Sequence, residues 1–253
     1  MTRQMRLNAF TINCVGHLAQ GLWRHPRDRS AEYTSIEYWV ELARTLERGR
    51  FDALFIADVL GVYDVYRASP DAALSNAAQV PANDPMLIVP VMAAVTDHLG
   101  FGVTGITSFE APYTFARRMS TLDHLTSGRI SWNIVTGYLD SAARAMGQAG
   151  QHPHDRRYEM AEEYMEVVYQ LWEGSWEDGA VVRDRATGVY ADPAKVHPVM
   201  HHGTYYRLEG IHLAEPSPQR TPVLFQAGAS SAGQRFAARH SECVFIGAPV
   251  GSP

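Results

Sequence analysis

Two hydrophobic patterns alternate along the chain. Short, nearly continuous apolar runs predict buried strands, and each is followed by a segment whose apolar residues recur at helical spacing. The predicted strands are residues 6–12, 51–58, 99–107, 129–138, 222–228 and 242–246. The predicted helices span about 34–49, 83–96, 112–126, 155–172 and 231–240. Regular alternation of strand and helix predicts an α/β protein with a parallel sheet.

Capping residues and prolines mark several of the predicted helix boundaries. Thr34 and Glu37 have the spacing of a capping box, and Asp155 is placed as the N-cap of the fourth helix. Pro90 predicts a kink in the second helix, and Ser230 or Ser231 would cap the last one. The inward face of the third helix is expected to carry Phe115, Met119, Leu122 and Leu125.

The long connections after the strand ends favour a TIM (β/α)8 barrel, and no GxGxxG motif indicates a Rossmann nucleotide site. Six strands do not close such a barrel, so either the chain is truncated after about the sixth strand or the sheet is open. We favour truncation of a single domain over residues 1–253. Residues 174–221 interrupt the alternation and predict an excursion with short strands around Val181 and Tyr205.

Residues 129–138 carry the most informative alternation of polar and apolar positions. Asn133 lies near the carboxyl end of this predicted strand, where parallel α/β proteins hold their ligands. Asn133 is therefore either a ligand contact or an amide that satisfies a neighbouring strand or loop. We expect Ile130, Trp132 and Ile134 to pack against helices, and Ser131 and Asn133 to face the barrel interior.

Composition narrows the class of protein. The chain has 253 residues, 46% of them hydrophobic and 19% charged, which is typical of globular domains. A net charge of −5 gives no basic surface for nucleic acid or an anionic membrane. Cys14 and Cys243 have no CxxC spacing, and the 11 histidines form no zinc pattern, so we expect reduced thiols and no metal. The absence of a long apolar run predicts a soluble, cytoplasmic protein.

Five motifs in chain order resemble one group of enzymes. The sequence resembles the flavin-dependent monooxygenases of the bacterial luciferase-like superfamily, in the branch of nitrilotriacetate, dibenzothiophene-sulfone and long-chain alkane monooxygenases. The resemblance covers essentially the whole chain. The motifs are TLERGRFDALFIAD (45–58), MAAVTDHLGFGVT (92–104), RMSTLDHLTSGRISWNIVTGY (118–138), YADPAKVH (190–197) and PVLFQAGASSAGQRFAA (222–238).

The resemblance implies a TIM barrel that uses reduced FMN, supplied by a separate NAD(P)H:flavin reductase, together with O2. Through a C4a-(hydro)peroxyflavin, such enzymes transfer one oxygen atom to a small organic substrate, which the sequence does not specify. A homo-oligomer is expected. Family members continue past GAPVGSP, so the chain is expected to be cut within the sixth strand–helix unit.

The resemblance also implies a set of flavin contacts. Asp58 follows the second strand, with a helix cap or an ion pair as the alternative role. One of Thr104 and Ser108 is expected to meet the ring or the ribityl chain. Backbone N–H groups, a hydroxyl and a helix dipole at residues 228–231 suit a phosphate, although an ordinary N-cap serine would look the same. The full set is Asp58, Thr104, Ser108, Asn133, Thr136, His154, Tyr158, Gly228, Ser230 and Ser231.

On the substrate side of the flavin, the resemblance places His17, Tyr63 and Gln79. Some relatives have a histidine where this chain has Tyr138, which becomes the fourth candidate catalytic residue. Hydroxyl, amide and imidazole groups there would hold a reactive oxygen group or move a proton.

Three other functions compete with the monooxygenase interpretation. The first is a luciferase-like oxidoreductase that transfers hydride with the deazaflavin F420. The second is a barrel fragment without catalysis, which the exposed sheet edges would favour. A hydrolase ranks third, because neither G-x-S-x-G nor a metal-ligand spacing is present.

Overall fold

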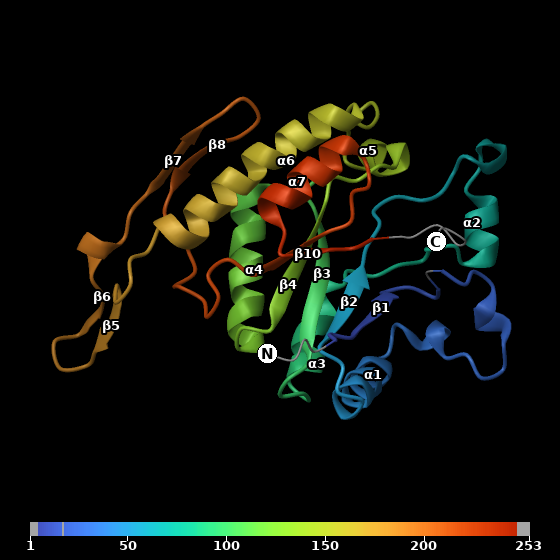
Figure 1. The fold of residues 1–253 in the computed structure, drawn as a ribbon, viewed down its shortest axis with the longest axis horizontal. Coiled ribbons are helices and arrows are strands. Elements are labelled where there is room, and N and C mark those ends of the chain that lie inside the picture. The colour runs from blue at the N-terminus through green and yellow to red at the C-terminus, as the bar shows by residue number, and fades with distance from the viewer. Residues whose placement is uncertain (1–4, 17, 247–253) are drawn as a thin grey trace.

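The computed structural model describes residues 5–16 and 18–246. Its main sheet has six strands in chain order, all paired in parallel (Figure 1). Each predicted strand is present, and the parallel α/β prediction is confirmed. The strands are β1 (Asn8–Ile12), β2 (Ala53–Ala57), β3 (Gly100–Ile106), β4 (Ile130–Val135), β9 (Val223–Gln226) and β10 (Cys243–Val244).

Five helices that connect successive strands of the sheet contact one another in the order α1–α3–α4–α6–α7. Two short helices, α2 and α5, lie in the connections after β2 and β4. Among the described residues, none of the helices combines the length and apolar character that crossing a membrane requires. The bounds are α1 (Ile36–Arg48), α2 (Asp71–Asn76), α3 (Val89–Ala93), α4 (Pro112–Thr126), α5 (Asp140–Ala145), α6 (His154–Tyr169) and α7 (Ser231–His240).

Trp132 forms the centre of the core between the sheet and the helices. Its ring centroid lies 4.5 Å from that of Phe115 on α4 and 6.1 Å from that of Tyr164 on α6. Its indole N–H donates to the carbonyl of Gly105 at 3.2 Å. Ile130, Trp132 and Ile134 are all fully buried, which confirms that this face of β4 packs on the helices.

Ser131 and Asn133 lie on the opposite face of β4. A Cβ built on Gly102 would lie 3.3 Å from both the Ser131 hydroxyl and the Phe55 ring, so these two side chains share the inner face. Phe55 stacks on Phe10 of β1 with centroids 5.3 Å apart. The inner face therefore carries both aromatic rings and polar groups, and Phe225 of β9 is paired in register with Asn133.

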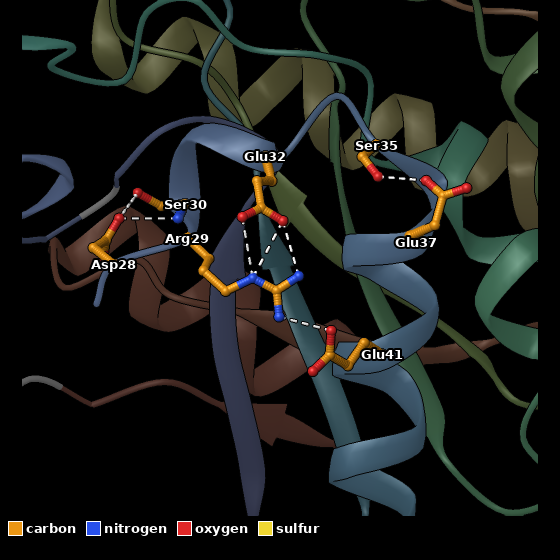
Figure 2. Close-up of polar contacts among 7 residues, drawn as sticks. All are labelled: Asp28, Arg29, Ser30, Glu32, Ser35, Glu37 and Glu41. Atoms are coloured by element: carbon orange, nitrogen blue, oxygen red, sulfur yellow. Dashed lines mark hydrogen bonds and ion pairs between the residues drawn. The ribbon is translucent and has the colours of Figure 1, made fainter. Parts of the chain in front are cut away.

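The N-terminus of α1 differs from the predicted capping box. Ser35, not Thr34, is the N-cap, and its hydroxyl donates to the Glu37 carboxylate at 2.5 Å instead of accepting a backbone N–H (Figure 2). The preceding turn is held by Arg29, which pairs with Glu32 at 2.8 Å and Glu41 at 2.7 Å. The helix begins at Ile36, one residue later than the predicted capping box places it.

The second and fourth predicted helices also need correction. A 3-10 turn, η4 (Met86–Ile88), leads into α3, so Pro90 lies in the first turn of a short helix and does not kink a long one. The fourth helix, α6, begins at His154 with Pro153 as its N-cap, and Asp155 is inside it. In the third helix, Leu125 is 58% exposed, so its assignment to the inward face is wrong.

Residues 174–221 contain two antiparallel hairpins that project from the main body in Figure 1. Tyr205 lies in the turn of the second hairpin, not in a strand. The Glu163 carboxylate on α6 accepts the backbone N–H groups of Tyr205 and Tyr206, at 3.0 and 2.7 Å, and so fastens this turn to the helix. The hairpins are β5 (Val181–Asp184) with β6 (Val189–Ala191) and β7 (Val199–His202) with β8 (Arg207–Gly210).

Replacement of Gly105 by alanine tests the packing around Trp132. A Cβ at this position would lie 2.6 Å from the Phe115 ring and 2.7 Å from the Trp132 indole nitrogen. We expect Gly105→Ala to lower the free energy of unfolding by about 1–3 kcal/mol, measured by urea denaturation. Gly174→Ala is the matched control, because a Cβ there meets no atom within 4 Å. Equal stability of the two variants would contradict this account of the core.

Candidate functional site

A pocket of about 530 Å³ opens beside the carboxyl ends of β2 and β3. One wall is the chain that follows β2, from Asp58 to Val62, and another is the loop from Gln79 to Met86. Thr104, Glu110 and Arg118 complete the polar part of the lining. Parallel α/β folds bind ligands at this edge of the sheet, so the pocket is the primary candidate site.

Asp58 is the first residue after β2, as predicted, and is partly buried in this pocket. Burial, with a smaller contribution from the charge of Asp84, raises the pKa of the Asp58 carboxyl to about 6. Its hydrogen-bond donor is the adjacent Val59 N–H at 2.9 Å, and no cation pairs with it among the described residues. The alternative role in an ion pair therefore has no support within this part of the chain.

Asn133 and Thr104 form a directed pair on the inner face. The Asn133 amide donates to the Thr104 hydroxyl at 3.0 Å, which in turn donates to the Ile56 carbonyl at 3.1 Å. Thr104 has thus used its one donor, keeps a second acceptor position, and orients the amide. The Oδ1 atom of Asn133 is buried and has no hydrogen-bond partner among the described residues. A buried acceptor without a donor calls for a ligand or a water molecule.

Ser108 and Thr136 meet next to this pair, at the ends of β3 and β4. The Ser108 hydroxyl donates to the Thr136 carbonyl at 2.6 Å. This hydrogen bond ties the two strand ends together. Which of Thr104 and Ser108 would touch a cofactor stays a prediction.

Tyr63, Gln79 and Tyr138 come together from three segments. The Tyr63 hydroxyl donates to the Gln79 side-chain oxygen at 3.1 Å and is in contact with the Tyr138 hydroxyl. Burial and the hydrogen bond to Tyr63 raise the pKa of Tyr138 above the usual value. The fourth candidate catalytic residue, His17, lies outside the described residues.

A second polar cluster lies where α6 begins beside the turn between β9 and α7. The Ser230 side chain caps α7 by accepting the Gly233 N–H at 3.1 Å, and it lies 3.1 Å from His154 Nε2. A Cβ on Gly228 would lie 2.6 Å from the Tyr158 hydroxyl. Ser231, the first residue of α7, is exposed. The structure therefore brings His154, Tyr158, Gly228 and Ser230 together.

Three charged residues of the pocket escaped the sequence analysis. They are Asp84, Glu110 and Arg118. Arg118 pairs with Glu110 at 2.7 Å, and burial raises the pKa of the Glu110 carboxyl. No spacing rule links a loop carboxylate to a helical arginine eight positions later, so only the fold reveals this pair.

The arrangement so far is that of a parallel α/β enzyme with polar groups at the carboxyl edge of its sheet. Comparison with known proteins identifies the family. Residues 17–252 match the model of the luciferase-like monooxygenase family, and the chain belongs to that family.

Individual relatives share most of this chain. It is 58% identical over 247 residues to the long-chain alkane monooxygenase of Geobacillus thermodenitrificans, covering 98% of this chain and 56% of the relative. It is 59% identical over 246 residues to the dimethyl-sulfide monooxygenase of Hyphomicrobium sulfonivorans, covering 97% and 51%. The chain thus spans about half the length of the curated relatives that it matches.

Solved structures agree with the fold. The crystal structure of a long-chain alkane monooxygenase matches with a TM-score of 0.95 at 57% identity, covering 96% of this chain and 56% of that one. A riboflavin lyase crystallised with modified FMN and riboflavin matches with a TM-score of 0.92 at 43% identity, covering 98% and 55%. The luciferase-like fold, with its sheet as a parallel half-barrel, is therefore supported.

The desolvated carboxyl of Asp58 predicts a pH-dependent stability. Its folded-state pKa of about 6 lies above the ordinary aspartate value of 3.8, so its contribution to stability is full below pH 4 and is lost as pH rises through 6. We expect Asp58→Asn to be more stable than the wild type at pH 7.5 by about 1–3 kcal/mol. Urea denaturation should show this difference shrinking towards pH 4.5, whereas a constant difference would contradict the assignment.

Proposed function

We propose that this chain is the catalytic part of a flavin-dependent monooxygenase. In this proposal it binds reduced FMN delivered by a separate NAD(P)H:flavin reductase and uses O2 to oxygenate a small organic substrate. The observation that carries the proposal is the orphaned acceptor of Asn133 beside the carboxyl-edge pocket, in a chain of this family.

The residues present fit a flavin mononucleotide. A carboxamide oxygen without a donor, on Asn133, suits the N–H edge of an isoalloxazine ring. The N-terminus of α7, with Ser230 and the nearby His154, suits the phosphate, because free N–H groups and the helix dipole favour an anion. The remaining proposed contacts are Asp58, Thr104, Ser108, Thr136, Tyr158, Gly228 and Ser231.

When bound, the reduced flavin supplies the electrons that activate oxygen. The residues of this chain would position the ring and exclude water. Tyr138, Tyr63 and Gln79 form a hydroxyl–hydroxyl–amide group that can hold a proton near the reacting atoms, and His17 is proposed to join them.

Further features of the proposal concern the assembled enzyme. We place it in the cytoplasm as a homo-oligomer, with an eight-stranded barrel of the luciferase-like type as its fold. Some related enzymes carry names such as nitrilotriacetate monooxygenase component A, which agrees with a two-component system. The names of two relatives, a long-chain alkane monooxygenase and a dimethyl-sulfide monooxygenase, favour a small neutral substrate such as an alkane or dimethyl sulfide.

The flavin site can be tested by binding alone. We expect Ser230→Ala and Asp58→Ala each to weaken the binding of FMNH2 about tenfold under anaerobic conditions, since each removes a polar contact of about 1.4 kcal/mol. Fluorescence titration provides the dissociation constants. Ser75→Ala, at an exposed position on α2, is the control. Unchanged affinity in both site variants would show that the flavin lies elsewhere, and preference for reduced F420 would point to hydride transfer instead.

The proposed proton-holding group can be tested by product yield. Tyr63→Phe removes the hydroxyl that links Tyr138 to Gln79, and His17→Ala removes the imidazole. We expect each to lower the ratio of oxygenated product to FMNH2 consumed by about threefold or more, with hydrogen peroxide making up the difference. The panel of substrates should include an alkane, dimethyl sulfide, an aromatic sulfone and an aminopolycarboxylate. A wild-type chain that oxygenates none of them is not a monooxygenase on its own.

A further inference from the structure

The short helix α5 follows Tyr138 almost directly and contacts the loop that carries Tyr63. The hydroxyl of Ser141, in the first turn of α5, accepts the backbone N–H of Val62 at 2.9 Å. The same hydroxyl donates to the backbone carbonyl of Val62 at 2.7 Å. One side chain thus satisfies both polar groups of the residue immediately before Tyr63.

Gly61 allows the loop to come this close to α5. Its φ of +95° is unfavourable for residues with a Cβ. A Cβ there would lie 2.6 Å from the Ser141 hydroxyl and 2.7 Å from the backbone nitrogen of Ala142. The double hydrogen bond of Ser141 therefore requires a glycine at position 61.

A second contact holds the other side of Tyr63. Arg144, in the last turn of α5, pairs with the Asp64 carboxylate at 2.5 Å. Its side chain is 51% exposed, so this ion pair contributes little on its own. Ser141, which lies in a half-buried position, is the stronger of the two anchors.

Through these contacts, one helix, α5, determines the positions of both Tyr63 and Tyr138. Tyr138 is connected to α5 through the chain, two residues before Asp140. Tyr63 is held on both sides, through Val62 and Asp64. The distance between the two hydroxyls is therefore set by how the 61–64 segment docks on α5.

We propose that Ser141 is a positioning residue that holds the Tyr63 hydroxyl against that of Tyr138 at the active site. The relevance of this positioning to oxygen transfer rests on the proposed function. The positioning itself is a property of the unloaded protein and can be measured there.

The direction of the hydrogen bonds links the position of Tyr63 to the pKa of Tyr138, which spectroscopy can measure. Tyr63 donates to Gln79, so Tyr138 donates to the oxygen of Tyr63. Burial and this donated hydrogen bond raise the pKa of Tyr138, since both disfavour its phenolate. Displacement of Tyr63 should remove the contribution of this hydrogen bond and so lower the pKa of Tyr138.

The test is a pH titration of the whole chain labelled with tyrosine carrying ¹³C at the Cζ atom, followed by NMR. Tyr138→Phe assigns the Tyr138 signal. In the wild type this signal should keep its neutral chemical shift to about pH 10.5, beyond the ordinary tyrosine pKa of about 10. In Ser141→Ala the titration midpoint of Tyr138 should fall by roughly one pH unit. Ser75→Ala, on the exposed face of α2, should leave it unchanged.

A second variant covers the case in which Ser141→Ala does not fold. Ser141→Cys approximates the side-chain volume but weakens both hydrogen bonds to Val62. It should shift the Tyr138 midpoint in the same direction. A midpoint that stays at the wild-type position in a folded Ser141 variant overturns the inference.

Activity measurements separate this inference from the proposed function. With FMNH2 and a productive substrate, Ser141→Ala should lower the product yield per flavin about threefold while changing the FMNH2 dissociation constant less than about twofold. If the wild type forms no product but the NMR midpoint shifts, the proposed function fails and the positioning by Ser141 stands. If product yield is unchanged although the midpoint shifts, Ser141 does not position groups for the reaction, and its proposed relevance to oxygen transfer is overturned.

Discussion

The packing of the Trp132 indole between α4 and α6 determines which face of β4 meets the helices. The side-chain period of a strand is two residues, so an outward Trp132 forces Asn133 to point inward. Gly105 on the neighbouring strand leaves room for the indole and accepts its N–H. A shift of one residue in β4 would bury the carboxamide among aromatic rings. The polar inner face near Asn133 is thus a consequence of the aromatic outer face.

The same packing places the second polar cluster. Tyr164 lies against Trp132 in the middle of α6, and this contact orients the whole helix across the sheet. Two turns earlier on α6, Tyr158 packs on Phe236 of α7 with ring centroids 5.7 Å apart. The first turn of α6 therefore reaches the turn between β9 and α7, where His154 meets Ser230. The core between sheet and helices and the candidate phosphate site share one helix as their common support.

Strong periodicity explains which parts of the fold were predictable. The six strands and the long helices α4 and α6 follow from apolar patterns that tertiary packing then reinforces. By contrast, α5 consists of DSAARA, whose small residues carry no amphipathic signal, so no helix is predicted between residues 126 and 155. Its contacts with the 61–64 segment join residues about 80 positions apart. The position of Asp58 was predictable, whereas the clustering of Tyr63, Gln79 and Tyr138 was inferred only through a resemblance.

The carboxyl groups at the two ends of β2 have pKa values that are shifted in opposite directions. Asp52, just before the strand, receives hydrogen bonds from the Arg6 guanidinium and the Leu7 N–H, and these lower its pKa. Asp58, just after the strand, has only the N–H of its neighbour among the described residues, and burial raises its pKa. Since desolvation of an unpaired carboxylate opposes folding, the chain keeps Asp58 at a cost in stability that Asp52 does not impose. A buried carboxylate that destabilises the fold, at the carboxyl edge of a parallel sheet, is expected in a binding site. It is not expected at a purely structural position.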